Sequence, residues 1–268
     1  MENRSFAVVT GAGKGLGKSF ALELGRQKKN IILVSLPGEN LEELANQIKQ
    51  ENNVETIPFE VDISDYKALE ELAKTINNHY SVDLLINNAG IGGSKPFDCV
   101  DTNYILKIIQ VNVVATSTFT HMLLPNLKQQ PKSHILNVSS LAAFSPTGYK
   151  TVYPASKAFI HSFSRGLYQE LKDTNVFVSV VNPGAMATNE EVSLRIKKQG
   201  LIGRLTLLDP DKVAKKCLRQ LINRDTVIML NPITWLISSI TPIWIKLPIM
   251  TNIVKREITY ADSICNGR

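Results

Sequence analysis

The stretch that decides the fold is "FAVVTGAGKGLG", residues 6–17. Its apolar start favours a short strand, and its second half carries Gly11, Gly15 and Gly17 in a G-x-x-x-G-x-G pattern. Glycines at a strand-to-helix turn let the backbone approach a pyrophosphate, and the N-terminus of the next helix attracts the negative charge. The stretch predicts a dinucleotide site, with a plain tight turn as the alternative. Leu16 stands where the stricter G-x-G-x-x-G pattern has its third glycine.

The same order of strand and helix repeats along the chain. Apolar runs that favour strands lie at 6–10, 31–35, 56–61, 83–87, 134–139, 177–182 and 226–230. Helix-like stretches lie near 16–28, 40–51, 65–78, 101–125, 153–172 and 209–223, and Asp65, Asp101 and Asp209 are placed to start three of them. Strands separated by helices imply a parallel sheet covered on both faces. We therefore predict an α/β fold, a doubly wound Rossmann-type sheet of about seven strands, over residues 1–230.

Composition excludes several classes of function. The net charge of +6 comes from basic residues scattered along 268 positions, without the arginine-rich arm expected of a nucleic-acid-binding protein. The three cysteines and four histidines show no metal-ligand spacing, so no metal site is predicted. The first residues contain no apolar run long enough for a signal peptide, and we expect a cytoplasmic protein.

The end of the second predicted strand bears on the choice between the two nicotinamide cofactors. An acid there would hydrogen-bond the adenosine 2′-hydroxyl and repel a 2′-phosphate. Here the strand ends in Ser35 and Leu36, and the first acid is Glu39. Lys14 in the glycine loop could pair with a 2′-phosphate or simply be a solvated loop lysine. These residues favour NADP(H), with NAD(H) as the alternative.

The stretch "TVYPASKAF", residues 151–159, holds Tyr153 and Lys157 four residues apart. On a helix both side chains lie on one face, provided that Pro154 falls in the first turn. A free tyrosine has a pKa of about 10 and is a poor proton relay at neutral pH. A nearby ammonium, together with the positive ring of an oxidised nicotinamide, would lower that pKa. The pair therefore predicts a proton donor for a carbonyl oxygen.

Six motifs in this order resemble those of the short-chain dehydrogenase/reductases, the single-domain branch with a Y-x-x-x-K active site. They are "TGAGKGLG" (10–17), "NNAG" (87–90), "VNV" (111–113), "NVSS" (137–140), the Tyr153–Lys157 pair and "NPG" (182–184), so the resemblance covers about residues 5–230. It implies a ketone/alcohol oxidoreductase in which Tyr153 relays the proton and Lys157 also binds the nicotinamide ribose. Ser140 would hold the substrate oxygen, with Ser139 as the alternative. Asn112 would break its helix and hold a relay water, unless it only bonds backbone.

The resemblance also implies further cofactor contacts. Leu16 in the glycine loop and Ser35 at the end of the second predicted strand are among them. Asp62 and Ile63 would contact the adenine, unless Asp62 is only a turn residue. Asn88, Ala89 and Gly90 would line the adenosine ribose, and Pro183, Gly184 and Thr188 would hold the nicotinamide and diphosphate. By the same resemblance we expect a homodimer or homotetramer.

Two segments are predicted to select the substrate. Residues 141–152 and the lid segment 185–208 would form an apolar pocket whose lid carries Arg195, Lys197 and Lys198. The extension 231–268 is strongly apolar at its start, and "TP" at 241–242 predicts two short apolar helices rather than one span. It would cover the pocket, lie on a membrane surface or pack against a second subunit.

The sequence thus predicts an NADP(H)-dependent oxidoreductase that interconverts a ketone and a secondary alcohol on a hydrophobic, lipid- or steroid-like substrate. An NAD(H)-dependent alcohol or hydroxysteroid dehydrogenase is the second hypothesis. A nucleotide-binding regulator without turnover is the third, and the set of Asn112, Ser140, Tyr153 and Lys157 argues against it.

Overall fold

The structure is a computed structural model that describes residues 5–184, 186, 208–230 and 240–265. Seven strands form one parallel sheet in the order β3-β2-β1-β4-β5-β6-β7. Their bounds are β1 Phe6–Thr10, β2 Asn30–Ser35, β3 Thr56–Glu60, β4 Val82–Asn87, β5 Ser133–Val138, β6 Val176–Val181 and β7 Val227–Ile228. The predicted strands are confirmed to within two residues at each end, and the predicted fold class is confirmed.

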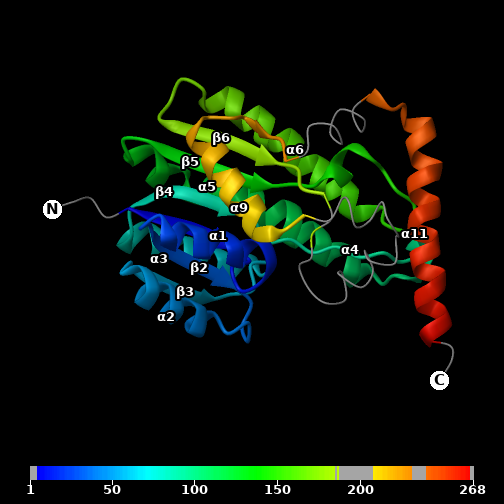
Figure 1. The fold of residues 1–268 in the computed structure, drawn as a ribbon, viewed down its shortest axis with the longest axis horizontal. Coiled ribbons are helices and arrows are strands. Elements are labelled where there is room, and N and C mark those ends of the chain that lie inside the picture. The colour runs from blue at the N-terminus through cyan, green and yellow to red at the C-terminus, as the bar shows by residue number, and fades with distance from the viewer. Residues whose placement is uncertain (1–4, 185, 187–207, 231–239, 266–268) are drawn as a thin grey trace.

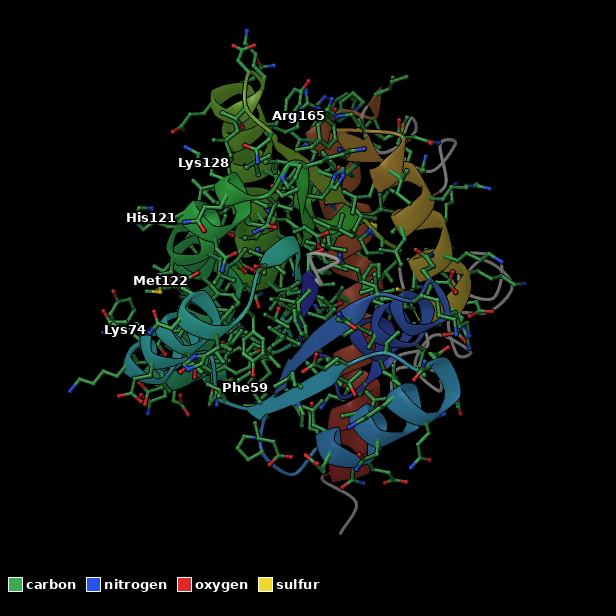
Figure 2. All side chains as sticks on the ribbon, turned by 90° about the vertical axis from the view of Figure 1, so that its left-hand side faces the viewer. Phe59, Lys74, His121, Met122, Lys128 and Arg165 are labelled. Carbon is green, nitrogen blue, oxygen red and sulfur yellow. The ribbon has the colours of Figure 1, made fainter. Side chains whose placement is uncertain are left out.

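Helices cover both faces of the sheet, as Figures 1 and 2 show. On one face lie α1 (Gly15–Arg26), α2 (Leu41–Asn52) and α9 (Pro210–Ile222), and on the other α3 (Tyr66–His79), α5 (Thr116–Gln129) and α6 (Val152–Leu171). Alternate strand residues divide between the two cores: Ala7 and Val9 pack under α1, whereas Phe6 and Val8 pack under α3 and α5. This two-sided burial explains why the strands read as continuous apolar runs.

Helix starts agree with the sequence. The carboxylates of Asp65, Asp101 and Asp209 accept backbone N–H groups in the first turns of α3, α4 (Thr102–Ile109) and α9. The helix predicted near 101–125 is interrupted after α4 by a π-helical turn, η2 (Gln110–Ala115), before α5 begins. Short 3₁₀ turns, η1 (Phe97–Cys99) and η3 (Leu141–Phe144), lie beyond the ends of β4 and β5.

The strand order reverses between β2-β1 and β1-β4, so the crevice for a ligand lies beyond the carboxyl ends of β1 and β4. The glycine loop, the residues after β4, η3 and the start of α6 all meet at this end of the sheet. The fold therefore brings the predicted site residues to one edge.

The C-terminal helix α11 (Ile243–Cys265) stands across this same end of the molecule (Figure 1). Thr251 accepts a hydrogen bond from the Gly148 N–H at 3.0 Å, and Lys246 donates to the Phe144 carbonyl at 2.8 Å. The expectation of two short helices is wrong for the second one, which has 23 residues and contains Pro248. After Pro248 the sequence contains no further glycine or proline until Gly267, so no helix-breaking residue ends the helix earlier. In the described part of the chain, no helix has the length and apolarity needed to cross a bilayer.

Candidate active site

The phenol and the ammonium lie together at the start of α6. Thr151 precedes the helix and Pro154 lies in its first turn, so the predicted position of Tyr153 at the helix entrance is confirmed. Lys157 sits one turn deeper, with its Nζ 5.9 Å from the centroid of the Tyr153 ring. The ammonium donates to the Val138 carbonyl at the end of β5, at 3.0 Å, and the residue is only 5% exposed.

The two serines after β5 have different partners. Ser139 is buried, and its hydroxyl donates to the Lys157 carbonyl at 2.7 Å. Ser140 is half-buried, accepts the Ala142 N–H at 3.2 Å, and hydrogen-bonds the Tyr153 hydroxyl. Of the two serines, therefore, Ser140 is the one whose hydroxyl contacts the Tyr153 hydroxyl.

Asn112 lies in the π-helical turn η2 and is buried. Its amide oxygen accepts the Ile91 N–H and its nitrogen donates to the Ile91 carbonyl, both at 2.9 Å. The same nitrogen donates to the Ser156 hydroxyl at 2.9 Å. The side chain thus clamps the loop after β4 against α6. Single π-helical turns inside helices occur frequently at functional sites, and the relay water expected beside Asn112 stays a prediction.

Burial shapes the charges of the pair. It lowers the pKa of Lys157 from 10.5 to about 8. For Tyr153, burial raises the pKa above 10, and the Ser140 hydrogen bond lowers it by less. In the chain without cofactor, burial therefore decides the direction of the Tyr153 pKa, and the lowering expected from Lys157 together with an oxidised nicotinamide ring stays a prediction. The Lys157 ammonium lies over the face of the Tyr153 ring, and a pKa of about 8 leaves it mostly protonated at neutral pH.

The glycine loop fits a dinucleotide. Gly11 has a φ of +64°, and a Cβ there would lie 2.9 Å from the Ala89 Cα. A Cβ at Gly17 would lie 2.0 Å from the Gly11 carbonyl oxygen, so any side chain there would clash with the backbone of the loop. The Asn88 amide donates to the Thr10 and Gly11 carbonyls at 3.0 and 3.2 Å and fixes the loop against the end of β4. The backbone is thereby exposed for a pyrophosphate at the start of α1.

The predicted adenosine corner holds an acid after all. Lys14 and Glu39 form an ion pair at 2.6 Å, and Ser35 hydrogen-bonds the same carboxylate. Burial would raise the pKa of Glu39, but the hydrogen bonds from Lys14 and Ser35 outweigh it, and the pKa is lowered. Glu39, four residues beyond the strand, folds back beside the glycine loop. The sequence suggested that no acid would stand there.

The other predicted cofactor residues are spread around the same edge. The Asp62 carboxylate accepts the Ser64 N–H at 3.0 Å, as a turn residue does, and lies 3.4 Å from Lys107. Ile63 is half-buried beside the α3 side of the core. Leu16 points into the core on the α1 side, so only its backbone faces the loop. A Cβ at Gly90 would lie 3.0 Å from the Lys157 Nζ. The Pro183 carbonyl accepts the Leu141 N–H at 2.9 Å and precedes Gly184, whereas Thr188 lies outside the described residues.

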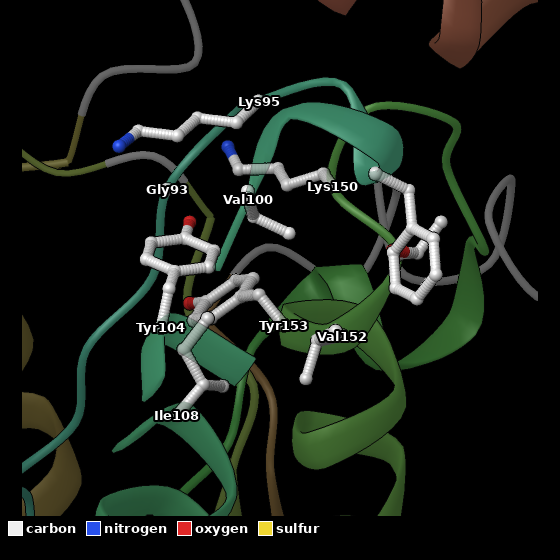
Figure 3. A pocket seen from close by; sticks show the side chains of 10 residues that line it. Gly93, Lys95, Val100, Tyr104, Ile108, Lys150, Val152 and Tyr153 are labelled. Atoms are coloured by element: carbon white, nitrogen blue, oxygen red, sulfur yellow. The ribbon is translucent and has the colours of Figure 1, made fainter. Parts of the chain in front are cut away.

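A cleft opens beside Tyr153 (Figure 3). Its lining includes residues 150–152, the end of the predicted segment 141–152, and also residues between 93 and 108, which the sequence did not assign to a pocket. Gly92 lies against the Tyr153 ring, where a Cβ would come within 2.6 Å of the Cδ2 atom. Gly93 lies in the same way against the Tyr104 hydroxyl. The glycine pair in "IGG", residues 91–93, is the signal that could have indicated this close approach.

The arrangement can perform one kind of chemistry. Tyr153 places a hydroxyl at the cleft beside the Ser140 hydroxyl, so an oxygen bound between them receives two hydrogen bonds. Lys157 lies behind the phenol, where its charge favours the phenolate left by proton transfer. A bound nicotinamide would supply the hydride. The site residues would supply the proton and hold the developing oxyanion.

The chain matches known proteins over most of its length. Residues 5–199 match the family of short chain dehydrogenases. The chain is similar to a very-long-chain 3-oxoacyl-CoA reductase of Rattus norvegicus, with 34% identity over 248 residues, 90% of this chain and 76% of the relative.

Solved structures give the same comparison. The fold is similar to a bulky-bulky ketone specific alcohol dehydrogenase from Comamonas testosteroni, with a TM-score of 0.76 and 26% identity over 87% of this chain and 90% of the other. It is also similar to a short-chain dehydrogenase from Sphingobium yanoikuyae in complex with NADPH, with a TM-score of 0.76 and 25% identity over 86% and 91% of the two chains.

Proposed function

The chain belongs to the short-chain dehydrogenase family, whose members act on CH–OH/C=O pairs, and from this premise we propose that it reduces hydrophobic ketones with NADPH. The observation that supports the proposal best is the convergence of Tyr153, Ser140 and Lys157 beside the glycine loop. In reduction, Tyr153 donates its proton to the carbonyl oxygen while Ser140 hydrogen-bonds that oxygen. The reverse transfer oxidises a secondary alcohol.

The apolar character of the substrate has two supports. Phe97, Val100, Ile108 and Val152 contribute apolar walls to the cleft. The names of similar proteins specify very-long-chain 3-oxoacyl-CoA and bulky-bulky ketones, both of which are bulky carbonyl compounds. The proposal is tested with a panel of long-chain and polycyclic ketones. For each ketone, the loss of NADPH absorbance measures the rate of NADPH oxidation. A panel that gives no turnover would instead favour a nucleotide-binding regulator.

The cofactor preference depends on Lys14 and Glu39. For an enzyme that prefers NADP(H), the 2′-phosphate replaces Glu39 as the partner of Lys14. We expect Lys14→Ala to raise the KM for NADPH about tenfold, the value of one charge-assisted hydrogen bond, and to leave the KM for NADH unchanged. Glu39→Ala should lower the KM for NADPH, because it removes a competing carboxylate.

The position of Glu39 in the Lys14–Glu39 ion pair supports the alternative hypothesis, an NAD(H)-dependent dehydrogenase. If the chain is an NAD(H)-dependent dehydrogenase, Glu39 accepts the 2′-hydroxyl, and Glu39→Ala raises the KM for NADH instead. The sign of the Glu39→Ala effect therefore separates the two hypotheses. Lys49→Ala, an exposed change near the far end of α2, serves as the control and should affect neither cofactor.

We propose in addition that α11 contacts an anionic membrane surface. Large apolar side chains are exposed on and just before this helix, at Ile240, Ile243, Trp244, Leu247, Ile249, Met250 and Ile253. Lys255 and Arg256 follow in the same helix, and basic residues beside an exposed apolar face are typical of helices that lie on lipid. The contact would bring the catalytic end of the sheet close to lipid-like substrates.

Vesicle sedimentation tests this contact. Trp244→Ser with Ile249→Ser should reduce partitioning onto phosphatidylglycerol vesicles about tenfold, because two side chains that are 72% and 53% exposed lose their apolar surface. Ile222→Ser is the control, since Ile222 is 60% exposed on α9. Equal sedimentation of all three proteins would exclude α11 as the membrane contact.

A homodimer or homotetramer is also proposed, on the basis of the family resemblance. Phe159 and Phe163 stack at 5.9 Å on α6, and Phe159 is exposed, so this helix offers an apolar face to a second copy. Light scattering on the purified chain measures the assembly. A monomer at all concentrations would contradict the proposal.

A further inference from the structure

Ser156 lies between Tyr153 and Lys157 on α6, and its hydroxyl makes a hydrogen bond on each side. It donates to the Tyr153 carbonyl at 2.7 Å, three positions earlier in the helix. It accepts from the amide nitrogen of Asn112 at 2.9 Å, across from the π-helical turn η2. Ser156 is only 4% exposed. Its hydroxyl therefore joins the backbone of the proposed proton donor to a side chain of another element.

The contacts that begin at Ser156 form a closed ring around Tyr153. Asn112 holds Ile91 by both its backbone N–H and its carbonyl, each at 2.9 Å. Gly92, the next residue, lies against the Tyr153 ring, where a Cβ would come within 2.6 Å of the Cδ2 atom. Because there is no free space between Gly92 and the ring, a displacement of this loop relative to α6 would displace the phenol as well. The hydrogen bonds of Ser156 thus help to set where the phenol lies.

The helix itself gives no reason for a serine at this position. Serine is a poorer helix former than alanine, and a hydroxyl that bonds a carbonyl of the preceding turn slightly destabilises a helix. Asn112, however, donates one amide hydrogen to Ile91 and needs an acceptor for the other, since a buried N–H without a partner is costly. Ser156 supplies that acceptor while its own hydrogen is donated to Tyr153.

We propose that Ser156 is a positioning residue for the proton transfer, acting through the Asn112 amide and the Tyr153 backbone. This inference rests on the proposed function and adds to it a residue outside the predicted catalytic set. The single hydrogen of the Ser156 hydroxyl is donated to the Tyr153 carbonyl, so the residue acts on the position of the phenol and not on the substrate. No part of the inference depends on the predicted basic residues of the lid, which lie outside the described residues: Arg195, Lys197 and Lys198.

A second serine on the same helix makes a matched pair of hydrogen bonds away from Tyr153. Ser164, eight positions later on α6 and 1% exposed, donates to the Ile160 carbonyl at 2.7 Å. It accepts from the amide nitrogen of Asn137 on β5 at 2.9 Å. Ser164→Ala therefore removes the same kind of bond as Ser156→Ala and deprives an equally buried amide of its acceptor. It does so without touching the proposed site, so it is the control.

Steady-state kinetics with a ketone that the wild type reduces test the proposal. Ser156→Ala should lower kcat about tenfold, less than the hundredfold that a misplacement of about 1 Å can cost, and should leave the KM for NADPH within twofold. Ser164→Ala should keep kcat within twofold of wild type, although urea unfolding shows a similar loss of stability for both variants. Equal kcat values for the two variants would mean that Ser156 has a structural role only, and the proposal would be wrong.

A double-mutant cycle tests the route through Asn112. If Ser156 acts through the Asn112 amide, Asn112→Ala already removes most of its effect, and adding Ser156→Ala should lower kcat less than twofold further. The same substitution in the wild-type background should cost the full tenfold. Losses that multiply in the double variant would mean that the two residues act independently, which contradicts the proposal.

Hydrogen exchange distinguishes this failure from failure of the proposed function, because it requires no turnover. Mass spectrometry of the NADPH-loaded chain should show exchange about tenfold faster within residues 88–93 and 151–158 in Ser156→Ala, and wild-type exchange there in Ser164→Ala. Faster exchange in a chain that reduces no ketone would leave the tie through Ser156 standing and overturn the reductase. Unchanged exchange and kcat in Ser156→Ala, with ketones reduced by the wild type, would do the reverse.

Discussion

Tyr153→Phe should reduce kcat for ketone reduction about a thousandfold and leave the dissociation constant for NADPH within twofold of the wild-type value. The size of the loss is that of a missing general acid, typically 10²- to 10⁴-fold. The variant removes one oxygen atom and keeps the ring that packs beside Gly92 and under Lys150. Initial rates of NADPH oxidation measure the first quantity, and quenching or enhancement of NADPH fluorescence measures the second.

A second phenol in the same cleft provides a matched control. Tyr104 is half-buried, and burial raises the pKa of its hydroxyl as it does for Tyr153. Tyr104 is not on α6, and no hydrogen bond to Ser140 is found for it in the described residues. Tyr104→Phe should therefore retain most of the wild-type kcat. Equal losses in the two variants would mean that the cleft, rather than the Tyr153 proton, determines the rate.

The fold could be predicted because its signals are local. Each buried strand is a short apolar run, and three helix starts, those of α3, α4 and α9, have a capping acid. The π-helical turn around Asn112 was expected only from the family resemblance, since asparagine alone does not distinguish a widened turn from a straight helix. The length of α11 was missed because "TP" at 241–242 indicates where a helix starts but not where it ends, and the helix continues through Pro248 to Cys265.

The site was less predictable because its properties depend on contacts between distant segments. Glu39 reaches the glycine loop only because the turn after β2 folds back, so counting residues from the strand end placed it too far away. Gly92 is needed because the Tyr153 ring approaches from α6, 61 positions later in the sequence. The pKa direction of Tyr153 depends on burial, which no spacing of Tyr and Lys reveals.

Lys157→Met should abolish most activity and yet stabilise the chain at neutral pH. The ammonium favours the phenolate that forms on proton transfer, so its loss removes charge stabilisation at the reacting pair, and we expect kcat to fall about a hundredfold. The stability gain arises because the wild-type chain buries this charge with one hydrogen bond, to the Val138 carbonyl, recorded for it in the described residues. Methionine fills a similar volume without that cost.

The lowered pKa of Lys157 determines how the stability difference between wild type and Lys157→Met changes with pH. Burial lowers the pKa of Lys157 from 10.5 to about 8. Below pH 8 both the folded and the unfolded chain carry the charge, and the fold bears the full cost of burying it. Between pH 8 and 10.5 the unfolded chain holds a proton that the folded chain has released. The free energy of unfolding of the wild type therefore rises with pH, relative to Lys157→Met, by about 3 kcal/mol.

Urea unfolding of both proteins without cofactor, at pH 7 and at intervals up to pH 10, measures this difference. Burial raises the pKa values of Tyr153 and Cys217 in the folded state, and their effect on stability is common to both proteins and cancels in the comparison. The variant should have the higher urea midpoint at pH 7, and the gap should narrow as the pH rises through 8 because the wild type then sheds its buried charge. Lys74→Met, at a lysine side chain that is 66% exposed, should show a gap that does not change with pH. Parallel curves for Lys157→Met and wild type would mean that the ammonium is hydrated in solution. Lys157 could then not act on the phenol from a desolvated position, and the electrostatic part of the mechanism would be wrong even if Tyr153 remained the proton donor.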